Sequence, residues 1–143
     1  MGLITLLPSC VAVDGSAAEF SWILRTFEDD PVRDCRNANI QDIELCWGPG
    51  GCDNGAETAR FPCEGGSGVT GFEIPNGDTF LAVRPICENG QIADLGTFVA
   101  PAPIARTARE GQIMTLNSFL IVVSDQTNSN SECAPAGCTC SGT

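Results

Sequence analysis

Apolar and polar residues alternate along several short stretches of this chain, at the period of two that is typical of strands with one buried face. The stretch EFSWILRTF places Phe20, Trp22 and Leu24 on one face, with Ser21 and Arg25 among the residues opposite. A second stretch, IQDIELCW, alternates in the same way. Its inward positions are Ile43, Leu45 and Trp47, and its outward positions are Asp42, Glu44 and Cys46. Both stretches therefore predict strands that cover a common core.

Turn signals separate the next stretches. Asn-Gly pairs occur at residues 54–55, 76–77 and 89–90. Both central residues of a type I′ hairpin turn need a positive φ, which Asn and Gly tolerate best. The pairs therefore predict antiparallel strands, and the apolar stretches beside them, 57–63 and 78–87, are the strands that we expect.

The apolar and polar residues between 94 and 123 alternate less regularly. Residues 94–108 contain two prolines, which cannot donate to a central ladder, so we expect an edge strand or an extended crossing. Residues 111–123 predict one long final strand, and no stretch holds the apolar stripe of a capped helix. The pattern predicts an all-β, antiparallel sandwich of about seven strands over residues 19–123, preceded by a leader-like segment and spacer at 1–18. Residues 124–143 predict a flexible tail unless its cysteines tie it back.

Charge narrows the range of functions. The chain carries a formal charge of −11, and its seven cations are all arginine. Such a chain repels nucleic acid, and we expect it to meet a membrane only through a covalent anchor. Histidine, lysine and tyrosine are absent, which excludes most general-base and Schiff-base chemistry. We therefore expect no catalytic residue and no cofactor.

Nine cysteines indicate the compartment. Structural zinc sites need histidine or closely paired cysteine ligands, and the chain has neither histidine nor a Cys-x-x-Cys pair. Disulfides in an oxidising compartment are the better interpretation, and they require export.

Cys10 stands apart from the other cysteines. It ends the stretch LPSC, which resembles a bacterial lipobox, although the basic start of a signal peptide is missing. An acylated Cys10 would leave eight cysteines for disulfides, an even number. The alternative is that Cys10 pairs with another cysteine and that an odd thiol lies elsewhere.

Cys46 and Cys52 enclose the turn-forming sequence WGPGG. Five intervening residues allow a chain reversal to bring the two Cα atoms to disulfide distance. A redox pair would need a helix N-terminus or nearby cations to lower a thiol pKa, and the sequence indicates neither. We therefore predict a disulfide across a hairpin.

One acidic cluster is the weak candidate for a metal site. It consists of Glu28, Asp29, Asp30 and Asp34. Its oxygens could serve calcium, but the spacing is not that of an EF-hand loop. A solvated loop is the favoured interpretation.

The order of FSWILRT, ARFPCEGGSGVTGF and IPNGDTFLAVRPICENGQI resembles the Ig-like or prealbumin-like β-sandwich domains of secreted bacterial lipoproteins of the myxobacterial type. The resemblance implies a fold and a location, and it favours a Cys35–Cys63 disulfide. Cys87 stands where that family usually has Asp, and it would then pair with one of the tail cysteines, leaving two of Cys133, Cys138 and Cys140 for each other. A competing map joins Cys46 to Cys87.

Together these observations lead us to expect a non-catalytic, exported surface lipoprotein that is a structural or protein-interaction module with an unidentified partner. The alternatives are a carbohydrate- or calcium-binding module, a released inhibitor or toxin-like effector, and a subunit of an extracellular assembly. Each would share the same disulfide-stabilised fold.

Overall fold

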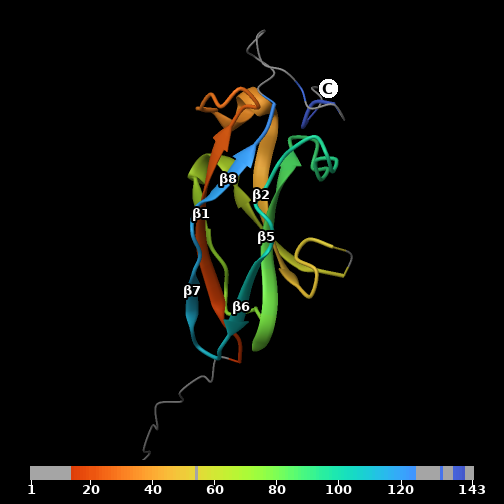
Figure 1. The fold of residues 1–143 in the computed structure, drawn as a ribbon. Helices are drawn as coiled ribbons and strands as arrows, with labels where there is room; N and C mark the ends of the chain where they lie inside the picture. Colours follow the sequence, from red (N-terminus) through yellow and green to blue (C-terminus); the bar gives the residue numbers. More distant parts are fainter. Residues whose placement is uncertain (1–13, 54, 125–132, 134–136, 141–143) are drawn as a thin grey trace, which may run out of the picture.

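The computed structural model describes residues 14–53, 55–124, 133 and 137–140. These residues form two four-stranded sheets that pack face to face (Figure 1), so the predicted β-sandwich is confirmed. The described part of the chain contains no α-helix, only two short 3₁₀ turns, η1 (Cys35–Ala38) and η2 (Cys63–Gly65). Within the described ranges there are eight strands, where about seven were predicted.

The first sheet is built around β1 (Ala17–Arg25). On one side β1 pairs antiparallel with β4 (Ser67–Val69). On its other side it pairs parallel with β7 (Ile113–Thr115) and then with β8 (Phe119–Val122). The sandwich is thus antiparallel except where the end of the chain returns beside its first strand.

The second sheet has the order β3-β2-β5-β6, and all its pairings are antiparallel. Its strands are β3 (Glu57–Pro62), β2 (Ile40–Gly48), β5 (Gly77–Cys87) and β6 (Ile104–Ala108). As the prolines predict, β6 follows Pro101 and Pro103 and lies at the edge of the sheet.

The core lies between the sheets, where the alternation places it. Every inward residue predicted on β1 and β2 is at most 6% exposed. Phe20 packs against Trp22, Phe61 and Phe119, with ring centroids 5.3–6.1 Å apart. The indole N–H of Trp22 donates to the carbonyl of Cys63 at 3.1 Å, so this buried donor is satisfied.

Two of the Asn-Gly pairs, at residues 76–77 and 89–90, do not form the predicted type I′ turns. Asn76 and Asn89 do not have positive φ, whereas Gly77 and Gly90 do, at 115° and 84°. Residues 76–77 lie where the chain enters β5 from the other sheet, and residues 89–90 make a tight reversal that pairs Ile86 with Ile92. The pair at 54–55 does lie between the antiparallel strands β2 and β3.

The predicted final strand, 111–123, is divided into β7 and β8. Its buried positions explain the break. Met114 and Leu116 share one phase of the alternation, whereas Phe119 and Ile121 follow the other. A single continuous strand would turn one of these pairs to solvent, so the chain leaves the ladder between them.

Candidate functional site

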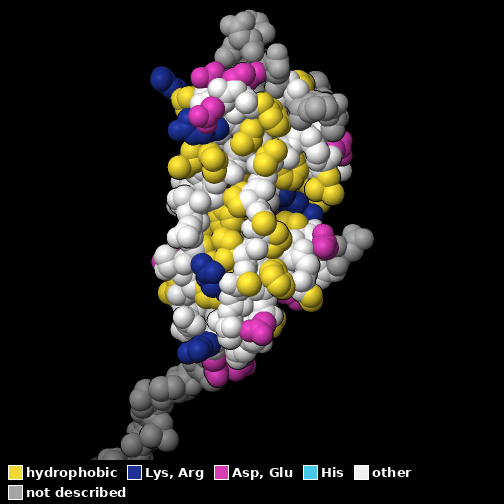
Figure 2. Space-filling model, viewed as in Figure 1, with side chains coloured by type: hydrophobic (Ala, Val, Ile, Leu, Met, Phe, Trp, Pro, Cys, Tyr) yellow, Lys and Arg dark blue, Asp and Glu magenta, His cyan; other side chains and the backbone are white. Residues whose placement is uncertain are grey.

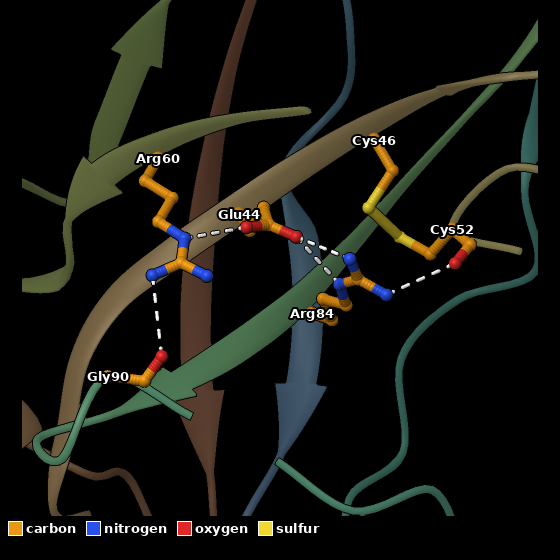
Figure 3. A network of polar contacts seen from close by, with 6 residues as sticks. All are labelled: Glu44, Cys46, Cys52, Arg60, Arg84 and Gly90. Atoms are coloured by element: carbon orange, nitrogen blue, oxygen red, sulfur yellow. Dashed lines mark hydrogen bonds and ion pairs between the residues drawn. A yellow bond between two sulfur atoms is a disulfide. The ribbon is translucent and has the colours of Figure 1, made fainter. Parts of the chain in front are cut away.

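The outer face of the second sheet carries a buried carboxylate. Glu44 lies at the middle of β2, directly opposite Arg60 of β3 and Arg84 of β5. Its side chain is 2% exposed and binds both guanidinium groups (Figure 3), with Arg60 Nε 2.7 Å from Oε2 and Arg84 Nη2 2.6 Å from Oε1. Cross-strand register thus brings two cations to one anion, and the group keeps a net positive charge.

The same arginines bind two loops. Arg84 Nη1 donates to the carbonyl of Cys52 at 3.1 Å, and Arg60 Nη1 donates to that of Gly90 at 3.4 Å (Figure 3). The alternation correctly places Glu44 and Cys46 on the outward face, but they are 2% and 0% exposed. Sequence patterning did not reveal this burial, because alternation does not show how loops fold back over the face, whether they follow β2 directly or contain Gly90.

A disulfide fixes one of these loops. The structure pairs Cys46 with Cys52, the pairing predicted from the spacing, with Cα atoms 5.0 Å apart. The bridge holds the loop that follows β2 against the outer face. Gly51 lies there with a φ of 67°, and a Cβ atom added to it would lie 3.0 Å from Pro103 and 3.3 Å from Ala82. The loop therefore packs tightly against the segment that leads into β6.

An open groove of about 400 Å³ lies beside this loop. Its floor includes Ala82 and Arg84 of β5, and one wall comes from the segment 92–103. Ile92, Leu95 and Val99 line it and are 42%, 90% and 55% exposed. Figure 2 shows hydrophobic side chains gathered along the middle of the molecule, whereas charged groups lie mainly toward its ends. The sequence patterns did not predict this groove.

Three further disulfides are present, of which two join parts of the sandwich or hold the tail to it and one lies within the tail. Cys35 pairs with Cys63, Cys87 with Cys140, and Cys133 with Cys138. The first is the pair that the family resemblance favours, and the second holds part of the tail against the end of β5. Because Cys46 pairs with Cys52, the competing Cys46–Cys87 map is not formed.

Thr139 anchors the tail through a buried hydrogen-bond network. Its N–H donates to Ser124 Oγ at 2.8 Å, and its hydroxyl accepts from the N–H of Ser124 at 3.0 Å. The same hydroxyl donates to the carbonyl of Thr97 at 2.6 Å. Thr139 and Cys140 are 3% and 2% exposed, so this part of the tail belongs to the packed molecule.

The structure separates the four acidic residues named as the weak candidate for a metal site. Asp29 pairs with Arg25 at 3.6 Å, while Asp34 caps η1 and binds Arg36 at 3.1 Å. Within the described residues, no group of three or more His, Cys, Asp or Glu side chains could hold a metal ion. Glu28, Asp29, Asp30 and Asp34 are thus not gathered around a common point, because the loop directs at least two of them to arginines.

Asp34 belongs instead to an exposed polar group beside the Cys35–Cys63 bridge. Hydrogen bonds from the side chain and backbone of Arg36 lower the pKa of Asp34 to about 2. A hydrogen bond shared with Asp34 raises the pKa of Glu64, which follows Cys63. The pairing with Asp34 also raises the pKa of Arg36.

Cys10, the predicted lipid anchor, lies outside the described residues. Among the residues that are described, no helix is long and apolar enough to cross a membrane. The disulfides are compatible with an oxidising environment, as the cysteine content predicts.

No protein-family model, curated protein or solved structure matches this chain.

Proposed function

We propose that this protein is an exported, non-catalytic surface lipoprotein whose β-sandwich serves as a structural or protein-interaction module. The observation that carries the proposal is the cysteine pairing. Four disulfides use eight of the nine cysteines, so Cys10 has no partner left within the chain. Cys10 is also the residue that ends the lipobox-like LPSC.

Charge and surface chemistry support the same role. A chain with a charge of −11 does not adhere to anionic lipid by itself, so residence at a membrane needs the covalent anchor. Four exposed apolar side chains on the first sheet supply the kind of surface that binding partners use: Ile23, Val69, Ile113 and Leu120. The resemblance to secreted lipoprotein domains agrees with this location.

Intact mass spectrometry of protein from its native cells tests the proposal. The sample is alkylated before and after reduction. We expect a chain that begins at Cys10 with added acyl mass, no alkylation before reduction, and labelling of the eight bridged cysteines after it.

The matched control is Cys10→Ser in the same cells. It should lose the acyl mass and leave the membrane fraction while it keeps all four bridges. An unlipidated native chain with Cys10 alkylated directly, or joined to another molecule by a disulfide, would refute the anchor.

A further inference from the structure

We propose that the groove beside the Cys46–Cys52 loop binds an amphipathic small molecule with an apolar body and one anionic headgroup. Carboxylate and phosphate headgroups share the chemistry that the site would recognise. The inference goes beyond the proposed location and does not depend on an anchor at Cys10. It follows from the groove's apolar walls, from the charge at its floor and from its size.

The walls are apolar and fixed in place. Hydrogen bonds between Val99 and Val122 in both directions, at 3.0 and 2.8 Å, attach the segment 92–103 to β8. A bond from the N–H of Ala93 to the carbonyl of Pro85, at 3.1 Å, attaches its start to β5. Leu95 and Val99 nevertheless keep most of their side chains exposed, at 90% and 55%. A preformed apolar surface of this kind favours an apolar ligand, because binding removes it from water without the cost of ordering a loop.

Arg84 determines the sign of the headgroup. Glu44 and the carbonyl of Cys52 hold its guanidinium in the floor of the groove, where the side chain is 20% exposed. A guanidinium carries five N–H donors, more than these contacts use. Glu44 balances only one of its two arginines, so the network keeps a positive charge and suits an anion.

The remaining charges are consistent with this choice. Asp53 is the carboxylate among the lining residues, and it is exposed to solvent, which weakens its effect on a bound anion. The overall charge of −11 acts weakly on a bound headgroup, since physiological salt screens charges beyond about 8 Å. The same overall charge disfavours a second copy of the chain as the occupant.

The size of the groove favours a small ligand. A volume of about 400 Å³ lies toward the lower end of the range for small-molecule sites. A single alkyl chain with its headgroup uses both the apolar walls and the guanidinium.

Isothermal titration calorimetry with single-chain probes below their micelle concentrations tests the inference. Dodecanoate and dodecyl phosphate should bind to the full chain, whereas dodecyltrimethylammonium should bind at least tenfold more weakly. The two anions distinguish a carboxylate from a phosphate preference. Equal binding of the cation, or no binding of either anion up to its micelle concentration, would overturn the proposal.

Two variants locate the binding. Val99→Asp places a carboxylate in the groove at an exposed position, and it should weaken dodecanoate binding at least tenfold. Val69→Asp is the matched control, because Val69 is 57% exposed on β4, which flanks β1 on the side away from β8 and does not line the groove. Circular dichroism checks that both variants are folded. An equal loss in the two variants would mean unspecific adsorption and would overturn the site.

Discussion

At the scale of single residues, the Glu44 network predicts that its two arginines contribute unequally to stability. Arg84 is 20% exposed and Arg60 is 44% exposed, while both bind the same buried carboxylate. Removing Arg84 leaves the buried charge of Glu44 without its more buried partner, which water cannot replace. Removing Arg60 costs less, because water can take the place of this more exposed guanidinium. We expect Arg84→Met to lower the free energy of unfolding by about 2–4 kcal/mol and Arg60→Met by about 0–1 kcal/mol.

Urea unfolding followed by tryptophan fluorescence measures both values. Leu120→Met, at an exposed position on the opposite sheet, controls for the substitution itself. Similar losses in the two arginine variants would contradict the unequal burial on which the prediction rests.

The pKa shifts of Asp34 and Glu64 predict opposite pH dependences of folding stability. The pKa of Asp34 falls from 3.8 to about 2, so its stabilising effect is present above 3.8 and is lost as the pH falls toward 2. The pKa of Glu64 is raised above 4.5. Its stabilising effect on the folded state is therefore present below pH 4.5 and is lost as the pH rises through the raised pKa. Carboxyl-carbon NMR titration should show both midpoints, and Arg36→Gln should move that of Asp34 upward toward 3.8.

Arg106→Gln is the control for that titration, since Arg106 lies on β6 and is not among the groups that shift Asp34. A midpoint for Asp34 near 3.8 in the unmodified protein would contradict the hydrogen-bonded arrangement.

At the scale of the elements, Gly51 and Gly55 offer a matched pair for testing the stapled loop. Both have positive φ, 67° and 85°, but only Gly51 has neighbours that an added Cβ atom would meet. Gly51→Ala should therefore cost about 1 kcal/mol for the backbone plus about 1–3 kcal/mol for overpacking against Pro103 and Ala82. Gly55→Ala should show the backbone cost alone, of about 1 kcal/mol.

Thermal and urea unfolding give the comparison. Equal losses in the two variants would indicate that the loop does not pack against the segment leading into β6.

Alternation predicted the central strands well because their inner faces alone contact the core. Local pattern could not predict the parallel return of β7 and β8 beside β1, because that pairing joins residues 96 and 97 positions apart. The phase shift between Leu116 and Phe119 was visible in the sequence, and it is the signal that divides the predicted last strand.

The candidate site was harder to predict than the fold. Glu44, Arg60 and Arg84 come together only once the register of three strands is known. A search for opposite charges at matching positions of adjacent predicted strands could have suggested this group. The groove also needs the position of the segment 92–103, which its proline-rich sequence does not specify.

At the scale of the whole molecule, the disulfides differ in the length of chain that they close, and so in the stability that each is expected to contribute. The Cys46–Cys52 bridge closes seven residues and the Cys87–Cys140 bridge closes fifty-four. Loop entropy assigns them about 2.4 and about 4.2 kcal/mol. Replacing both cysteines of the longer bridge by alanine should therefore cost more, and it should also increase amide exchange at Thr139 and Ser124, which the bridge holds together. Equal unfolding free energies for the two paired variants, or unchanged exchange at Thr139, would contradict this ranking.

Access to solvent predicts which bridge reduces first. Reduction of a disulfide requires a thiolate or a phosphine to reach one of its sulfur atoms, so burial of the bridge slows its reduction. Cys133 is exposed and Cys138 half-buried, whereas Cys46, Cys63 and Cys140 are each at most 2% exposed. Brief treatment with a phosphine without denaturant, followed by alkylation and peptide mapping, should label Cys133 and Cys138 and leave the melting temperature almost unchanged.

The other three bridges should open only with unfolding, because each has at least one cysteine in the core. Treatment in denaturant is the control and should label all eight cysteines together. Early labelling of Cys46 and Cys52 would instead mean that the loop over the groove opens in the native state. The groove would then lack the fixed floor and wall on which ligand binding depends, so the order of reduction also tests the rigidity of the proposed site.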